Sequence, residues 1–196
     1  MNNFDFDILI IGGGHAGCEA AWISSQFDLK IGLLTLPNVG LASTPCNPSV
    51  GGVGKGQVVR ELDALGGLMP KLADLSAIQF RILNESKGFA VQSTRVQVDK
   101  KKYSYFAEKI LDEVININIL RHKVSHISKL KDGFQIQTDS GHNFLTKKLI
   151  VTTGTFLGGK LHTGDDQRTG GRHDCQASSN LVSLFSEIKT LPVRFK

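Results

Sequence analysis

Apolar positions in the first 35 residues follow the patterns of strand, helix and strand in turn. Four consecutive apolar residues, Ile8 to Ile11, form a short run that predicts a buried strand. An alanine-rich segment from about His15 to Phe27 predicts a helix, and residues 29–35 predict a second strand, parallel to the first. This order of elements is typical of an α/β fold with a parallel sheet.

The middle of the chain continues with helical and extended segments. Helical spacing predicts helices over residues 58–65, 75–85 and 101–114, and alternation predicts an extended segment over residues 89–98. Gly66 and Gly67 follow the first of these helices and predict its end, because glycine readily takes the left-handed conformation that closes helices.

The last third of the chain is rich in short apolar runs separated by turns. Residues 148–153 predict a buried strand, and residues 177–188 predict a last helix after a polar segment. A small antiparallel meander is predicted from four further runs: residues 118–121, 124–130, 134–138 and 144–145. Together these elements predict a Rossmann-like α/β fold, in which an antiparallel β-meander interrupts a parallel sheet flanked by helices.

A glycine turn joins the first predicted strand to the first helix. Gly12, Gly14 and Gly17 have the spacing G-x-G-x-x-G. The first glycine permits the tight turn, the second allows the backbone to approach a pyrophosphate, and the third allows the helix to pack near the strand. The unpaired N–H groups of the helix start then face the anion. This context predicts a nucleotide-binding βαβ unit; the alternative is a turn that only joins a strand to a helix.

The second predicted strand departs from the usual dinucleotide motif. In many such units this strand ends in an acidic residue that holds the ribose hydroxyls. Here it ends in Leu33-Leu34-Thr35, and the next acidic residue is Glu61. The ribose contact is therefore expected to be weaker, or to come from Thr35 or from elsewhere. This departure argues against an ordinary NAD dehydrogenase.

Residues 37–56 are rich in Gly, Pro, Ser and Asn and predict a long loop, a feature that compact domains usually reserve for function. Residues 51–56 superficially resemble a P-loop, but the spacing is wrong and Gly56 stands where that motif needs Ser or Thr. We therefore reject a nucleoside triphosphatase. We expect a flexible backbone that approaches a ligand, with Lys55 available to a phosphate.

Composition narrows the class of protein only slightly. The chain has 196 residues, of which 40% are hydrophobic and 21% are charged, as in ordinary soluble domains. A net charge of +5 permits a polyanionic partner without requiring one. The N-terminus lacks the pattern of a signal peptide, and no apolar run is long enough to cross a membrane. We therefore expect a cytoplasmic protein with no membrane partner.

The three cysteines, Cys18, Cys46 and Cys175, are too widely spaced for a zinc site, and no metal site is expected. Cys18 is expected to be a small core residue of the first helix. Cys46 lies in the long loop near Lys55, and it is either a reactive thiol with a lowered pKa or a buried loop thiol. Basic clusters at residues 100–102, 121–123 and 147–148 are interpreted as solvated faces in preference to RNA contacts.

Six longer motifs resemble those of one protein family. They are, in order, GGGHAGCEAA, CNPSVGGVGKG, VVRELDALGG, IQFRILNESKG, TRVQVDKKKY and TTGTFLGGKLHTG. These motifs resemble the N-terminal part of the glucose-inhibited division protein A family, FAD-dependent enzymes that modify the wobble uridine of transfer RNA. The resemblance covers essentially the whole chain, and CNPSVGGVGKG is far more specific than the glycine turn.

The resemblance implies an activity and a set of partners. The activity is the installation of a carboxymethylaminomethyl group at C5 of the wobble uridine, with FAD as cofactor, NADH as reductant, methylenetetrahydrofolate as one-carbon donor and glycine as the amine. The implied partners are transfer RNA and a GTPase, which joins a homodimer of the family in a heterotetramer. The implied fold is the FAD-binding fold of glutathione-reductase type, in which a βαβ unit and a meander hold the adenosine half of FAD.

The resemblance also implies roles for individual residues. The backbone of Val124 would meet the adenine, Ser178 would make a further FAD contact, and Cys46 matches a family cysteine discussed as a catalytic thiol. The FAD pyrophosphate would be cradled by the turn residues Gly12, Gly13, Gly14, His15, Ala16 and Gly17, although His15 at this position equally well only packs. Candidates for cofactor or RNA phosphates are Lys55, Arg60, Arg81 and Arg95. Departures from the family pattern are the run LASTP before Cys46, Phe89, Gln92 and the segment around Cys175.

We therefore expect residues 1–196 to be the N-terminal portion of an FAD-binding domain, without the NADH-binding part and the C-terminal helical part of the family. Two other interpretations stay open. One is a folate- and FAD-dependent transfer-RNA uridine methyltransferase, and the other is a truncated remnant without catalysis. Because part of the FAD site is expected to be missing, we do not expect the chain alone to hold one FAD per molecule.

Overall fold

The computed structural model describes residues 3–45, 47–154, 157 and 159–169. Its helices are α1 (His15–Ser24), α2 (Gly56–Ala64), α3 (Leu68–Ser76) and α4 (Lys100–Asp112), with a short 3-10 helix at Phe89–Val91. The strands of the main sheet are β1 (Phe6–Ile11), β2 (Ile31–Thr35), β6 (Ile117–Arg121), β7 (Val124–Lys129), β8 (Phe134–Thr138) and β9 (Asn143–Val151). A second sheet contains β3 (Ser49–Gly51), β4 (Ala77–Leu83) and β5 (Ser93–Val98), and a hairpin contains β10 (Lys160–Thr163) and β11 (Asp166–Thr169). The helix predicted over residues 177–188 lies outside the described residues.

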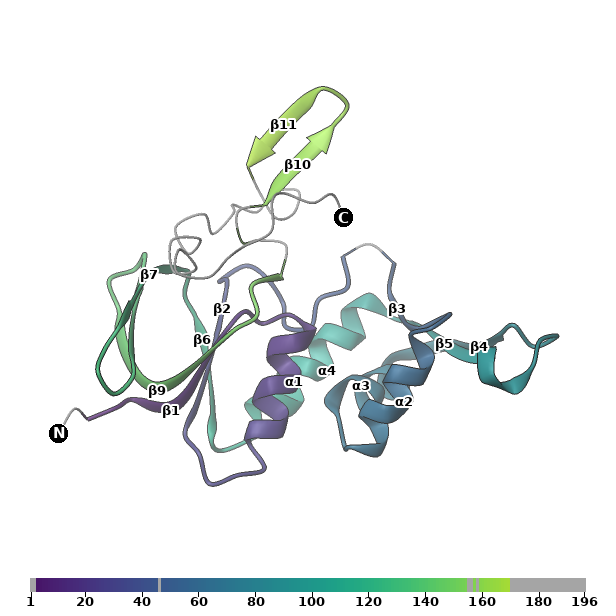
Figure 1. The fold of residues 1–196 in the computed structure, drawn as a ribbon, viewed down its shortest axis with the longest axis horizontal. Helices are drawn as coiled ribbons and strands as arrows, with labels where there is room; N and C mark the ends of the chain where they lie inside the picture. Colours follow the sequence, from purple (N-terminus) through teal and green to yellow (C-terminus); the bar gives the residue numbers. More distant parts are fainter. Residues whose placement is uncertain (1–2, 46, 155–156, 158, 170–196) are drawn as a thin grey trace.

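The main sheet has six strands in the order β6-β2-β1-β9-β8-β7 (Figure 1). Strands β6, β2, β1 and β9 are parallel, whereas β7, β8 and the first part of β9 form an antiparallel meander. The predicted fold class, a Rossmann-like α/β fold with an antiparallel β-meander, is confirmed.

Two details of the predicted sheet are wrong. The first run assigned to the meander, residues 118–121, belongs to β6, which lies parallel to β2 because its apolar side chains Ile117 and Ile119 pack into the core on the helix side of the sheet. The second error concerns residues 144–145 and 148–153, since both belong to β9. The two lysines between these apolar runs are exposed, and they do not interrupt the strand.

Strand β1 is apolar from Ile8 to Ile11 because both of its faces are covered there. Ile8 and Ile10 point into a core that contains side chains of α1, α3 and α4, whereas Leu9 and Ile11 point into a second core beneath the meander. Leu9 and Ile10 are fully buried. A strand with two covered faces shows a continuous apolar run instead of alternation, and this is the pattern of residues 8–11 in the sequence.

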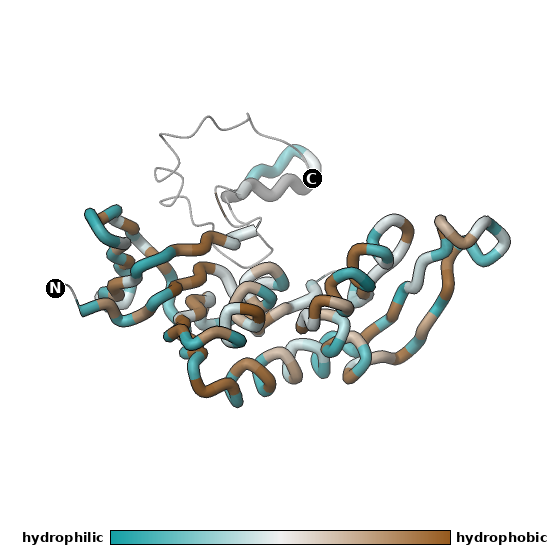
Figure 2. Tube along the Cα trace, turned by 60° about the horizontal axis from the view of Figure 1, so that its bottom comes forward, coloured by the Kyte–Doolittle hydropathy of each residue, from teal (hydrophilic) through white to brown (hydrophobic). Residues whose placement is uncertain are grey.

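The helix predicted over residues 75–85 is wrong. Helix α3 ends at Ser76, and the following residues form β4, which pairs antiparallel with β5. The β-branched and aromatic side chains of Ile78, Phe80 and Ile82 alternate with other residues, and that period of two favours a strand. We call residues 77–98 the arm, because β4 and β5 project from the body of the molecule in Figure 1. Figure 2 shows the strands of the arm changing between hydrophobic and hydrophilic residues along their length.

Two other predictions are corrected by the observed strands β5 and β3. The extended segment predicted over residues 89–98 is confirmed only in its second part, as β5, because the 3-10 helix precedes it. The loop predicted over residues 37–56 contains β3, which pairs with β5.

The helix ends are set by local hydrogen bonds. At the end of α2, Gly66 has a φ of 77° and its N–H donates to the carbonyl of Asp63, while the N–H of Gly67 donates to that of Leu62. This pair of bonds is a Schellman motif, so the predicted helix end is confirmed. Helix α4 begins where the Asp99 carboxylate accepts two backbone N–H groups, both at 2.9 Å. Among the described residues, no helix combines the length and apolar character needed to cross a membrane.

Candidate nucleotide-binding site

The glycine turn lies between the end of β1 and the start of α1, at the carboxyl edge of the parallel strands (Figure 1). Gly12 has a φ of 113°, and a Cβ at this position would overlap the backbone carbonyl of Thr152. A Cβ at Gly17 would overlap the carbonyl oxygen of Gly12. Both positions therefore need glycine on steric grounds, in the way that the spacing predicted.

The outer side of the turn is open. An added Cβ at Gly14 would meet no described atom within 4 Å, and Gly14 and Ala16 are both exposed. Gly14 is the N-cap of α1 and provides no side-chain cap, so the N–H groups of the first helical turn have no acceptor inside the helix. The first helical hydrogen bond runs from the N–H of Cys18 to the carbonyl of Gly14, at 2.9 Å. An open helix start of this kind suits an anionic group.

Two segments form hydrogen bonds with the turn from its inner side. The Thr152 hydroxyl donates to the carbonyls of Ile11 and Gly12, at 3.0 and 3.1 Å. The N–H of Ala42 donates to the carbonyl of Gly13 at 2.9 Å, which attaches the loop after β2 to the turn. Motif spacing missed both contacts, and the only signal for Thr152 was its place near the end of the strand predicted over residues 148–153.

Thr35 is not available as the ribose contact that the sequence allowed. Its side chain lies beneath Gly13, where an added Cβ would come within 2.5 Å of the Thr35 hydroxyl and of Leu41. Thr35 is only 4% exposed. The end of β2 therefore supports the turn from inside.

His15 and Tyr103 pack together beside the helix start. Their ring centroids are 5.6 Å apart, and burial lowers the pKa of His15, so that its imidazole is neutral at pH 7. Burial raises the pKa of Tyr103, whose hydroxyl has no hydrogen-bond partner within the described part of the chain. The Thr44 hydroxyl is also buried and without a partner there. The His15 ring therefore packs beside Tyr103, and a role of His15 at the phosphates stays a prediction.

Cys18 is a core residue, as expected. It is 2% exposed, and its thiol donates to the carbonyl of Gly13 at a sulfur–oxygen distance of 3.4 Å. Burial raises the pKa of this thiol to about 12. Cys18 therefore has almost no thiolate at neutral pH and is not a nucleophile.

This burial predicts that iodoacetamide modifies Cys18 very slowly in the folded chain. At pH 8 we expect a rate at least about 100-fold below that of glutathione, since only the thiolate reacts. Peptide-resolved mass spectrometry after timed quenching measures the rate at this position alone. In denaturant the same position should react at the rate of a free thiol, and labelling at that rate in the folded chain would contradict the packing.

The remaining predicted site residues are not all gathered at the turn. Val124 begins β7, and its side chain is buried in the core beneath the meander, which leaves only its backbone for a ligand. Cys46 and Ser178 lie outside the described residues. Lys55 is exposed before α2, and Arg60 donates to the Thr94 hydroxyl at 3.1 Å.

Arg81 and Arg95 face each other across β4 and β5, in a sheet separate from the one that carries the turn. A hollow of about 720 Å³ runs along β4 and is lined by residues 80–86, none of which belongs to the turn. The described residues include no group of three or more His, Cys, Asp or Glu side chains placed to hold a metal ion.

The glycine turn lies at the carboxyl edge of a parallel sheet, is packed on its inner side and has no described atom close to Gly14 on its outer side. This arrangement defines a Rossmann-type α/β protein. The family model "Glucose inhibited division protein A" matches residues 7–196. The chain belongs to this family.

Curated relatives of the family share much of this sequence. The tRNA uridine 5-carboxymethylaminomethyl modification enzyme MnmG of Buchnera aphidicola subsp. Cinara cedri is 45% identical over 193 residues, which cover 95% of this chain and 30% of the relative. The enzyme of the same name from Chlamydia trachomatis serovar L2b is 42% identical over 190 residues, with the same coverage of 95% and 30%. The chain thus spans about 30% of the length of the curated relatives it matches.

Solved structures agree with the fold. GidA of Aquifex aeolicus has a TM-score of 0.86 and 40% identity, over 93% of this chain and 30% of that one. The GidA-related protein from Thermus thermophilus has a TM-score of 0.58 at 17% identity, over 91% of this chain and 68% of that one, and shows the fold alone.

Proposed function

We propose that the chain is the FAD-binding portion of an enzyme that adds a carboxymethylaminomethyl group to C5 of the wobble uridine in transfer RNA. The observation that carries this proposal is the open glycine turn in a chain of the glucose inhibited division protein A family. The relatives named above act on tRNA uridine by name. Their name and the family match favour this activity over a uridine methyltransferase and over a remnant without catalysis.

The turn fits the pyrophosphate of FAD. The backbone from Gly12 to Gly17 would surround the phosphates, because Gly14 leaves room for them and the first N–H groups of α1 have no acceptor in the helix. The positive end of the α1 dipole favours the same anionic group. FAD, when bound, supplies the redox chemistry, and the protein binds and orients it.

Other contacts belong to the same proposal. The Val124 backbone would meet the adenine, which agrees with a buried side chain that leaves only main-chain atoms free. Ser178 would add a further FAD contact, and Cys46 would be the reactive thiol of the long loop. His15 and Ala16 would contribute backbone N–H groups, since the His15 ring packs on Tyr103.

The whole protein would need more than this segment. We propose that residues 1–196 are the N-terminal portion of an FAD-binding domain, and that the full-length protein uses NADH and methylenetetrahydrofolate. We also propose a GTPase partner, a homodimer within a heterotetramer and a cytoplasmic location, all of which suit an enzyme acting on transfer RNA.

A chimera tests this function, with this chain in place of the matching segment of the Aquifex aeolicus protein. That segment has the same fold at a TM-score of 0.86, so the chimera should fold. We expect it to purify with bound flavin, seen by its absorbance, and to restore 5-carboxymethylaminomethyluridine, detected by mass spectrometry of digested transfer RNA.

Each failure of the chimera has a separate meaning. A folded chimera without flavin would overturn the cofactor proposal. A chimera that binds flavin but yields 5-methyluridine would support the methyltransferase, and one that binds flavin without modifying uridine would support the remnant. The unchanged Aquifex aeolicus protein, assayed alongside, is the control.

A further inference from the structure

The arm has one face that is almost entirely polar. Gln79 lies opposite Gln97, and Arg81 lies opposite Arg95, so all four side chains share one face of the β4–β5 pair. We call these four residues the polar face of the arm. On the neighbouring strand β3, Ser49 and Gly51 continue the two rows without adding a charge. The face therefore carries two positive charges and no carboxylate.

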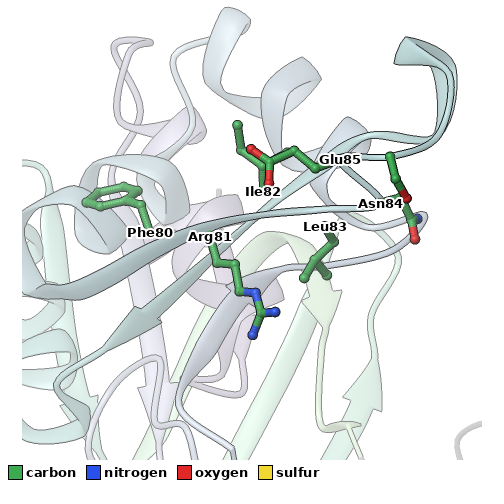
Figure 3. A pocket seen from close by; sticks show the side chains of 7 residues that line it. Phe80, Arg81, Ile82, Leu83, Asn84 and Glu85 are labelled. Carbon is green, nitrogen blue, oxygen red and sulfur yellow. The ribbon is translucent and has the colours of Figure 1, made fainter.

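The two arginines are placed where like charges repel. Side chains directly opposite each other in an antiparallel pair have Cβ atoms about 5 Å apart, and like charges there are destabilising. Neither guanidinium has an ion-pair partner among the residues that the structure describes. Figure 3 shows Arg81 and Leu83 on one side of β4 and Ile82 with Glu85 on the other, so this carboxylate does not neutralise the pair.

Three basic groups in or beside the main sheet differ from this pair. Arg121 forms an ion pair with Glu108 at 3.2 Å, and Lys123 forms one with Asp139 at the same distance. Lys147 is paired with an aspartate in β1. The basic clusters at residues 121–123 and 147–148 are thus largely neutralised within the fold. The arginine pair of the arm keeps its charge for a ligand.

We propose that the polar face of the arm binds the phosphate backbone of RNA. Two guanidinium groups side by side offer planar, bidentate donors to phosphate oxygens. The amides of Gln79 and Gln97, one row along, are able to hydrogen-bond sugar hydroxyls or base edges. This inference rests on the proposed function, which names transfer RNA as the substrate.

The position of the arm favours RNA over the cofactor. The arm lies in a separate sheet from the glycine turn and projects from the body of the molecule (Figure 1). A small cofactor held at the turn needs no contact so far along the projecting sheet, whereas a polynucleotide spans such distances.

Replacing both arginines tests this surface. The variant carries Arg81→Gln and Arg95→Gln, and the matched control carries Lys129→Gln and Lys131→Gln, which remove the same charge from exposed positions of the meander. Binding of a fluorescein-labelled anticodon stem-loop RNA is followed by anisotropy between 50 and 200 mM salt. Circular dichroism checks that both variants fold.

We expect the arginine variant to bind RNA about tenfold more weakly at 100 mM salt, with the slope of log affinity against log salt reduced by about 1.5. The control should bind within about twofold of the unchanged chain. Equal losses in the two variants would overturn the proposal, since charge alone would then explain binding. Arginine-dependent binding of polyglutamate as tight as that of RNA would overturn the assignment to RNA.

The flavin content of the chimera separates this inference from the proposed function. A chimera with Arg81→Gln and Arg95→Gln should keep its flavin, because neither residue contacts the turn. Loss of RNA binding with flavin retained supports the polar face as an RNA site. Unchanged RNA binding with flavin retained overturns this inference and leaves the proposed function intact.

Discussion

Replacing Gly17 by alanine is expected to lower the free energy of unfolding of this chain by about 3 kcal/mol. In the chimera, the same replacement is expected to abolish flavin binding. The added Cβ would overlap the carbonyl oxygen of Gly12 and approach the Thr152 hydroxyl to 2.9 Å. Neither the backbone of the turn nor the end of β9 is able to retreat without breaking hydrogen bonds. Urea denaturation followed by circular dichroism measures the change in this chain.

Gly14→Ala is the matched control for this variant. The same methyl group at Gly14 meets no described atom within 4 Å, and the backbone φ of −73° suits alanine. We expect the stability of the chain to change by less than about 0.5 kcal/mol. In the chimera, however, flavin affinity should fall at least about tenfold, because the methyl group occupies the space of the pyrophosphate. Normal flavin affinity in Gly14→Ala would show that the ligand does not lie on the turn.

Replacing Glu19 by alanine is expected to lower the free energy of unfolding by about 2 kcal/mol. Glu19 belongs to α1, but its carboxylate accepts the N–H groups of Leu68 and Met69 at 2.9 and 2.5 Å. It thus caps α3, whose own N-cap residue is a glycine without a side-chain acceptor. The variant leaves two N–H groups of α3 without an acceptor and removes a link between two helices.

Two further variants decide whether capping is the cause. Glu19→Gln keeps one acceptor oxygen and should lose about half as much stability as the alanine variant. Glu61→Gln removes the same charge from an exposed position of α2 and should change stability by less than about 0.5 kcal/mol. Equal effects at the two glutamates would attribute the loss to net charge.

Local patterns predicted much of the fold. The apolar run at residues 8–11, the glycine spacing and the Gly66-Gly67 helix end are local signals, and the structure bears out all three. The error over residues 75–85 has a physical reason. A helix preference in the flanking residues competed with the alternation of Ile78, Phe80 and Ile82, and pairing with β5 determined the outcome.

The contacts that complete the site join distant parts of the chain. The Thr152 hydroxyl donates to the carbonyl of Gly12, which is 140 residues away in the sequence. Glu19 caps a helix that begins 49 residues further along the chain. The pairing of Arg81 with Arg95 depends on the register of two strands, which spacing in the sequence does not reveal. The residue types that suit a nucleotide were therefore predictable, but the partners that position them were not.

The place of β9 in the sheet has a consequence for synthesis on the ribosome. The first half of β9 pairs with β8, which directly precedes it in the sequence, and the second half pairs with β1, the first strand of the chain. The same strand thus joins the last strands of the main sheet to be translated with the first one. Bringing such distant segments together carries a large loop-closure cost, which makes this pairing a late event in folding. Because Thr152 follows β9, the glycine turn acquires the two hydrogen bonds from the Thr152 hydroxyl only after residue 152 has left the exit tunnel. The first motif of the chain to be translated is thus among the last to reach its final form.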